Sequence, residues 1–300
     1  MNGQNINNNQ YNHGLYGSDS PIVIFFGQTK SGKSTALVRL IKYLYDTQYT
    51  SDICPTFHNY YYPKKVPNQI TLQQVKTDFD DNLTCGINNV KSTAYRYLCN
   101  INPLGASDAE CRFLEAPGED LFALQNAEKT NIYAQSGETV QYAYLNDIIN
   151  TTSYKKIWIF FMDPEFTNEL QNSNAAYINA IQNIPIREDD NVIFVLNKED
   201  LVKQDPIAAP ILKKGYKAYI NAKYGNILTK EPFTTETYKW WRFWSQHQKK
   251  EHFRVLPFCA YTDKTVRNLN EDEETSHPLS DPSYPQNLWA TIQAAINNEF

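Results

Sequence analysis

Eight consecutive residues near the N-terminus have the types and spacing that hold phosphate. Residues 27–34 read GQTKSGKS, which matches the pattern GxxxxGK[ST], the Walker A motif. In this pattern small residues let backbone N–H groups converge on phosphate oxygens at the start of a helix. Lys33 would reach the outer phosphates, and the hydroxyl of Ser34 would bind a Mg²⁺ ion that bridges two phosphates. The predicted phosphate-binding residues are Gly27, Gln28, Thr29, Lys30, Ser31, Gly32, Lys33, Ser34 and Thr35.

The residues on either side of this segment predict the elements that would hold it. Four apolar residues, Val23 to Phe26, precede it, as in a buried parallel strand. After the segment, apolar positions recur at helical spacing through Leu44. The order is therefore strand, turn and helix, which is the arrangement that a phosphate loop requires.

A second polar segment follows a later apolar run and could read a nucleotide base. Val192 to Leu196 predict a buried strand, and the tetrapeptide NKED comes directly after it at 197–200. The carboxylate of Asp200 can accept hydrogen bonds from both N1–H and the exocyclic amino group of guanine, a pair that adenine does not offer. Open α/β sheets bind ligands at the carboxyl ends of their strands, so the position supports this role. The alternative is a polar turn that leads into a helix.

Two shorter segments complete a set of four motifs, each after an apolar run. Residues 115–118 read EAPG, and residues 259–261 read CAY. In this order, the four segments resemble the motifs of the translation-factor-like, Ras-related class of P-loop GTPases, with EAPG in place of DxxG and CAY in place of SAK. The chain is similar to this class over residues 21–300, as a divergent, bacterial-type small GTPase with a guanylate-binding-protein-like phosphate loop.

The resemblance implies how the base would be held. Asn197 would contact the base and brace the phosphate loop, and Lys198 would lay its aliphatic stem along the base plane. Asp200 would discriminate guanine, and a backbone N–H at Cys259 or Ala260 would meet the guanine oxygen. The implied ligand is GTP or GDP.

The resemblance also implies a metal and phosphate set. Glu115, longer than the aspartate of the family, would hold Mg²⁺ through a water, beside the direct ligand Ser34. The backbone N–H of Gly118 would bind the terminal phosphate. A threonine in the loop after the first helix would sense that phosphate, for which the sequence offers Thr50 and Thr56, with Thr56 favoured.

The catalytic residues implied by the family pattern are Lys33, Lys30 and Glu119. Glu119 stands where Ras-like members carry a water-orienting glutamine; a carboxylate accepts a proton but cannot donate as an amide does, so slow hydrolysis is expected. An alternative is an acid that favours a helix start. Lys30 stands where guanylate-binding proteins carry an arginine finger, and would be either a built-in cation over the phosphates or a solvated lysine.

The order of apolar runs predicts an α/β fold: a three-layer, mostly parallel, doubly wound sheet of the P-loop NTPase, Ras-like type with insertions. We expect a disordered Asn-rich leader at 1–19 and a GTPase domain at 20–300, with insertions near 47–92 and 201–252. The expected strands lie near 22–26, 93–100, 111–115, 156–162, 192–196 and 254–259. The expected helices lie near 33–46, 141–150, 166–183, 207–223, 238–249 and 286–299.

Composition narrows the classes of partner and compartment. The 300 residues carry a net charge of −5 with no basic tract, which argues against a dedicated nucleic-acid binder. The apolar runs are shorter than the roughly 20 residues of a membrane span, and the N-terminus lacks a signal-peptide pattern. The five cysteines are scattered, without the paired spacing of a zinc site. We therefore expect a cytoplasmic protein.

Three functional hypotheses are consistent with these residues. The first is a GTPase that hydrolyses GTP slowly to GDP and phosphate and reorders segments 47–70 and 119–135 for a protein partner, with nucleotide-dependent dimerisation left open. The second is a GTP-bound scaffold without turnover, prompted by Glu115 and Glu119. The third is a P-loop ATPase or kinase in which NKED is accidental.

Overall fold

The structure is a computed structural model that describes residues 20–28, 31–50, 55–56, 98–115, 154–164, 171–241, 244–260 and 281–299. It describes only the backbone at 34, 55–56, 98–99, 115, 171–176, 236–241 and 244–249. The expected leader at 1–19, the expected helix at 141–150 and most of the expected insertion at 47–92 lie outside these residues.

Seven strands form the central sheet, in the order β2-β3-β4-β1-β5-β6-β9. The strands are β1 (Ile22–Gly27), β2 (Pro55–Thr56), β3 (Leu98–Ile101), β4 (Cys111–Glu115), β5 (Lys156–Met162), β6 (Asn191–Leu196) and β9 (Phe253–Pro257). The run β4-β1-β5-β6-β9 is parallel throughout, whereas β3 pairs antiparallel with β4 and β2 antiparallel with β3. The sheet is therefore mostly parallel, with its antiparallel strands at one edge.

The central strands are buried on both faces, which explains their continuous apolar sequences. In β1, Ile22, Ile24 and Phe26 contribute to one hydrophobic core, while Val23 and Phe25 contribute to the other. All six residues of β1 and all seven of β5 are buried. A parallel sheet covered by helices on both faces requires this pattern.

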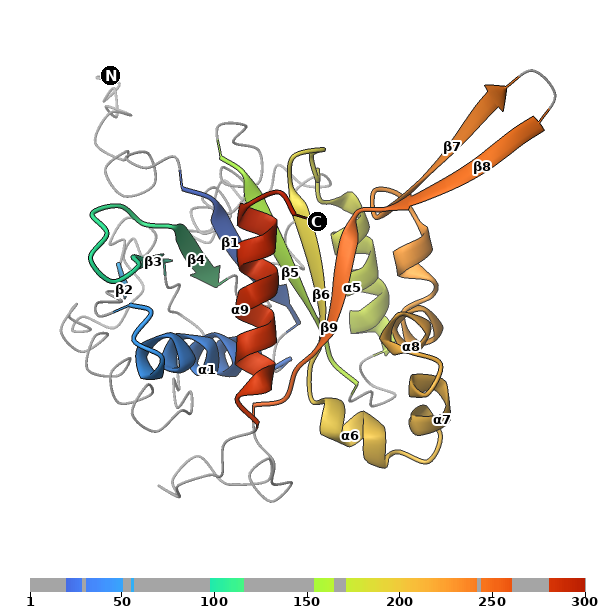
Figure 1. The fold of residues 1–300 in the computed structure, drawn as a ribbon. Coiled ribbons are helices and arrows are strands. Elements are labelled where there is room, and N and C mark those ends of the chain that lie inside the picture. The colour runs from blue at the N-terminus through green and yellow to red at the C-terminus, as the bar shows by residue number, and fades with distance from the viewer. Residues whose placement is uncertain are drawn as a thin grey trace, which may run out of the picture.

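Helices cover the two faces in separate layers. They are α1 (Lys33–Asp46), α5 (Gln171–Asn183), α6 (Glu199–Gln204), α7 (Ala208–Leu212), α8 (Tyr216–Lys223), the 3₁₀ helix η5 (Ile227–Thr229) and α9 (Ser283–Ile296). Residues of α1 and α9 pack into one core, and residues of α5, α7 and α8 into the other. Figure 1 shows α9 and α1 on one face of the sheet and α5 and α8 on the other. The three-layer, doubly wound fold class is confirmed.

The aromatic segment expected as a helix at 238–249 is a β-hairpin, so that prediction is wrong. Strands β7 (Thr234–Trp241) and β8 (Trp244–Glu251) pair antiparallel over their whole length. The segment is rich in aromatic residues, and β7 begins with threonines just before it; both residue types favour strands over helices. Figure 1 shows the hairpin projecting beyond the central sheet. The expected insertion at 201–252 is thus helical only in its first part.

The single helix expected at 207–223 is two helices. Gly215 lies between α7 and α8 with a φ of 108°, a value that L-residues rarely adopt. The chain therefore turns at this glycine and starts a new helix at Tyr216. The other described elements agree with their expected ranges to within a few residues, although β2, α6 and η5 were not expected.

Candidate functional site

The phosphate-binding segment forms the turn between β1 and α1. Gly32 adopts the left-handed region with φ 80°, and α1 begins at the next residue, Lys33. Within the turn, the N–H of Ser31 donates to the carbonyl oxygen of Gln28 at 3.1 Å. The first turn of α1 has neither a side-chain cap nor an acidic residue. Its N-terminal N–H groups and the positive end of its dipole therefore favour an anion.

Lys33 is packed beneath this turn. Its side chain is buried, and Nζ donates to the carbonyl oxygen of Gln28 at 2.8 Å. Gly27 permits this packing, because a Cβ there would lie 2.8 Å from Ser31 Oγ and 2.9 Å from Phe161 Cβ. The lysine is thus held within the turn whose backbone would carry the phosphates.

Asn197 joins the turn to the end of β6. Its Nδ2 donates to the carbonyl oxygen of Ser31 at 2.7 Å, and the residue is buried. A Cβ on Gly32 would lie only 2.3 Å from the same Nδ2, so this contact requires glycine. The N–H of Asn197 in turn donates to the carbonyl oxygen of Met162, the last residue of β5. The carboxyl ends of β1, β5 and β6 are therefore bound together.

Lys198 adopts the left-handed region with φ 52° and forms an ion pair with Asp163. The distance from Lys198 Nζ to Asp163 Oδ2 is 2.9 Å, and both side chains are mostly buried. Sequence reasoning missed Asp163. Its signal was its position, because it directly follows β5 at the sheet edge where parallel strands place ligand-binding residues.

The NKED and CAY segments meet at Asp200. The thiol of Cys259 donates to Asp200 Oδ1 at 3.0 Å, and the Cys259 side chain is buried. The N–H of Phe258 donates to the carbonyl oxygen of Leu196, which holds the ends of β6 and β9 in register. Ala260 follows at a partly exposed position. The structure therefore brings together the two segments expected to surround the base.

Glu199 forms a buried polar cluster beside these residues, and sequence reasoning did not predict it. Its carboxylate accepts hydrogen bonds from the hydroxyls of Tyr216 and Tyr284 and from Lys203 Nζ. Burial alone would raise the pKa of Glu199, but these donors outweigh it and hold the pKa below its usual value. The pKa values of both tyrosines are raised, first by burial and then by the bond to Glu199.

Several predicted site residues fall outside the described part of the chain. Thr29, Lys30, Gly118 and Glu119 are not described, and the side chains of Ser34, Glu115 and Thr56 are not described either. The predicted roles of these residues therefore stay predictions. Among the described residues, no group of three or more His, Cys, Asp or Glu side chains gathers in a way that could hold a metal ion.

Thr50, the other threonine considered for phosphate sensing, lies at the wrong end of α1. Its N–H donates to the carbonyl oxygen of Leu44, near the C-terminal end of the helix. The 14 residues of α1 span about 21 Å, which separates Thr50 from the phosphate loop. Of the two candidates, only Thr56 remains. Thr35, in the first turn of α1, is partly buried beside the phosphate loop.

Comparison with known proteins gives distant structural likenesses only. No protein-family model and no curated protein matches the chain. One similar solved structure is the Ski7 GTPase-like domain of S. cerevisiae bound to GTP, with a TM-score of 0.39 and 16% identity over 93% of this chain and 50% of that chain. Another is Sup35 complexed with GDP, with a TM-score of 0.29 and 10% identity over 85% of this chain and 41% of that one.

The chain therefore spans half or less of the length of these two matched chains. At such scores neither likeness assigns a ligand or an activity to it. None of the helices in the described part of the chain is long and apolar enough to cross a membrane. What the chain's own sheet and loops establish is the fold class: a mostly parallel, three-layer α/β fold, consistent with a P-loop GTPase fold.

Proposed function

We propose that this chain binds GTP with Mg²⁺, hydrolyses it slowly to GDP and phosphate, and acts as a nucleotide-dependent switch for a protein partner. The proposal includes a GTPase domain over residues 20–300, a cytoplasmic location and a nucleotide-dependent dimer as one form that switching could take. It includes no nucleic-acid partner.

The hydrogen bond from Asn197 Nδ2 to the carbonyl oxygen of Ser31 carries the proposal. It connects a phosphate-binding turn with a segment whose carboxylate can read guanine, although 166 positions separate the two residues. An accidental NKED turn would not need a buried amide directed at the phosphate loop. The contact between Asp200 and Cys259 supports the same reading, because it places the base-reading carboxylate against the CAY segment.

The described residues fit a triphosphate. An uncapped helix start, a buried lysine at its first position and two glycines in which a Cβ would collide with the surrounding loop form a cradle for anionic oxygens. The buried hydroxyl of Ser31 also has no hydrogen-bond partner among the described residues. Such a group costs free energy unless a ligand or a water satisfies it. Ser34, Glu115 and Thr56 would hold Mg²⁺, which would neutralise charge on the phosphates during transfer.

The roles of the residues follow from their chemistry. Lys33 would place its positive charge on the outer phosphates, and Lys30 would add a second cation over them. Glu119 would orient the attacking water but would be repelled by the terminal phosphate, which makes turnover slow. Asp200 would accept two hydrogen bonds from guanine, and Lys198, held by Asp163, would cover the base plane.

Calorimetry tests the proposal directly. Affinities for GTP and ATP are measured with magnesium present for the wild type, Lys33→Ala and Asp200→Ala, and phosphate release is followed in the same samples. The matched control is Lys42→Ala, a lysine farther along α1 that pairs with Asp46 at the surface. We expect GTP preference, a loss of about 100-fold or more with Lys33→Ala, loss of guanine preference with Asp200→Ala, and no change with Lys42→Ala.

Other outcomes identify the alternatives. Tight GTP binding without phosphate release would indicate the GTP-bound scaffold suggested by Glu115 and Glu119. ATP preference, or indifference to Asp200→Ala, would contradict guanine recognition and favour a P-loop ATPase or kinase.

A further inference from the structure

The residue between Lys198 and Asp200 is a buried carboxylate with its own binding partners. Glu199 is 1% exposed, and the three donors to its side chain come from three different elements. Lys203 belongs to α6 itself, Tyr216 begins α8, and Tyr284 lies in the first turn of α9. An ionised carboxylate is costly to bury unless it is hydrogen-bonded in this way.

The cluster is joined to the base-reading residues through the backbone. The N–H of Glu199 donates to the carbonyl oxygen of Phe258 at 3.2 Å, one residue before Cys259. Tyr284 also packs against the ring of Phe258, with ring centroids 6.2 Å apart. A single residue therefore fixes the start of α6 to α8, to α9 and to the residue that follows β9.

We propose that Glu199 is a positioning residue for nucleotide-base specificity: by anchoring the start of α6 to Tyr216 and Tyr284, it sets the orientation of the Asp200 carboxylate. This inference rests on the proposed function. Asp200 follows Glu199 in the first turn of a six-residue helix, which is too short to hold its orientation alone. The Cys259 thiol donates to Asp200 Oδ1. Glu199 adds tertiary anchors for this turn through Tyr216 and Tyr284.

The two tyrosines connect the base-reading turn to more distant parts of the chain. Tyr216 lies in the 201–252 insertion, and Tyr284 lies in the C-terminal helix. Both hydroxyls donate to the same carboxylate, so a displacement of α8 or α9 would move the base-reading turn. Base recognition is therefore coupled to α8 and α9, which lie outside the NKED and CAY segments.

The test compares GTP with inosine triphosphate, which lacks the exocyclic amino group of guanine. The ratio of the two affinities reports on whether Asp200 engages that group. The variants are Glu199→Gln, Tyr216→Phe and Tyr284→Phe, each measured by calorimetry alongside a thermal melt. Two controls are matched: Tyr219→Phe changes a buried tyrosine of α8 that is not a donor to Glu199, and Lys203→Ala removes the exposed donor, which contributes little.

We expect the affinity ratio of GTP to inosine triphosphate to fall by about tenfold with Glu199→Gln and by about threefold with each tyrosine variant, because weakening a charge-assisted hydrogen bond loosens the turn. Both controls should keep the wild-type ratio. The proposal is overturned if the variants weaken both nucleotides equally, or lower only the melting temperature. A wild type with no guanine preference would overturn the proposed function as well, so the two failures are distinguishable.

Discussion

The two ends of β6 each carry an asparagine that donates its side-chain amide to a distant carbonyl. At the start of the strand, Asn191 Nδ2 donates to the carbonyl oxygen of Ala295 in α9 at 2.9 Å. Just past its end, Asn197 Nδ2 donates to the carbonyl oxygen of Ser31 in the phosphate loop at 2.7 Å. The chemistry is the same, but one bond fastens a helix to the sheet and the other joins two candidate ligand-binding loops.

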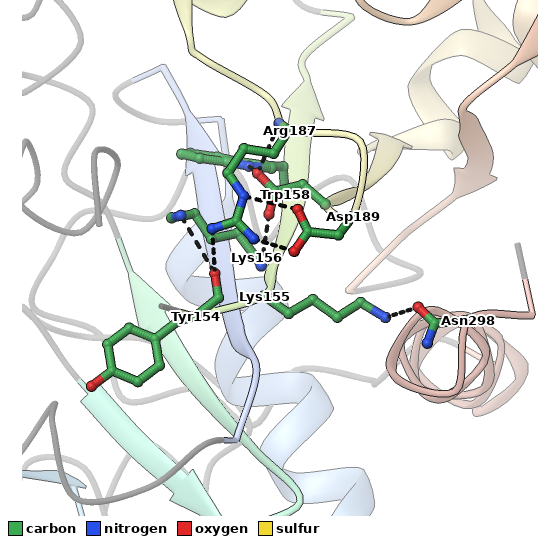
Figure 2. A network of polar contacts seen from close by, with 8 residues as sticks. Tyr154, Lys155, Lys156, Trp158, Arg187, Asp189 and Asn298 are labelled. Atoms are coloured by element: carbon green, nitrogen blue, oxygen red, sulfur yellow. Dashed lines mark hydrogen bonds and ion pairs between the residues drawn. The ribbon is translucent and has the colours of Figure 1, made fainter. Parts of the chain in front are cut away.

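The polar groups around the start of the strand have structural partners. Figure 2 shows Lys155 reaching toward Asn298 at the end of α9, where Lys155 Nζ also donates to the carbonyl oxygen of Ile296. A cation suits a helix C-terminus. The buried carboxylate of Asp190 accepts the N–H groups of Lys156 and Arg187 at 3.0 and 3.1 Å. These side chains therefore satisfy backbone carbonyl and N–H groups at this end of the sheet.

At the other end of the sheet, where the parallel strands have their carboxyl ends, polar side chains connect one loop to another. Asn197, Lys198 and Asp200 each contact a residue that follows or belongs to another loop, and the phosphate turn has an uncapped helix start beside them. Parallel α/β sheets bind ligands at the carboxyl ends of their strands. In this chain, that end of the sheet is also where polar side chains connect the loops. Substitutions near the start of β6 should change the stability of the fold, and substitutions just past the end of β6 should change ligand affinity.

Asp190→Ala should give the largest effect and should leave nucleotide affinity unchanged. It leaves the buried N–H of Lys156 and the partly buried N–H of Arg187 without their acceptor, which we expect to cost about 3 kcal/mol of unfolding free energy. Thermal melts and calorimetry on the same sample check both parts. The control is Asp189→Ala, an exposed carboxylate paired with Arg187, for which a change below about 1 kcal/mol is expected. Reduced GTP affinity without lost stability would contradict a purely structural role for the polar groups near the start of β6.

Gly32→Ala should come next and should act on ligand affinity. The added Cβ would meet Asn197 Nδ2 at 2.3 Å, so the bond to the phosphate loop must break. GTP affinity is expected to fall about 100-fold by calorimetry. Gly105→Ala is the control, because Gly105 has nearly the same φ of 82° but nothing within 4 Å of an added Cβ. Equal affinities for the two variants would count against the Asn197 contact.

The pair Asn197→Ala and Asn191→Ala tests the two ends of β6 directly. Each variant loses one hydrogen bond, so both should lower stability by about 1 kcal/mol in denaturant unfolding. Only Asn197→Ala should also lower GTP affinity, by about tenfold, because it frees the phosphate loop. If both variants bind GTP equally well, the two ends of β6 do not differ in their role in ligand binding.

The smallest expected effect is the dependence of the stability of the fold on pH. The pKa of Glu199 lies below its usual value of 4.5 in the folded chain, so its carboxylate stabilises the fold fully above about pH 5. That contribution is lost as the pH falls through the folded pKa. The melting-temperature difference between wild type and Glu199→Gln should therefore be largest near pH 7 and should shrink toward pH 4. A difference that grows with acid would contradict the ionised cluster.

Local sequence patterns were enough to predict that the candidate site lies at the carboxyl ends of the parallel strands. The apolar runs located β1, β5 and β6, and the candidate site residues after β1 and β6 were expected at the carboxyl ends of those strands. The pattern could not predict the cluster around Glu199, because its tyrosines lie 17 and 85 positions farther along the chain. The segment 238–249 was expected to be a helix, whereas its aromatic residues, together with the threonines just before it in β7, favoured the hairpin that forms.

Exchanging Asp200 for asparagine tests guanine recognition most directly. A carboxylate offers two acceptors to the N1–H and amino group of guanine, whereas an amide offers one acceptor and one donor, which suit the N1–H and C2 carbonyl of xanthine. Calorimetry with GTP and xanthosine triphosphate should show the wild type preferring GTP and Asp200→Asn preferring xanthosine triphosphate, with each preference about tenfold or more. An unchanged GTP preference in the variant would contradict the assignment of Asp200 as the base-reading residue.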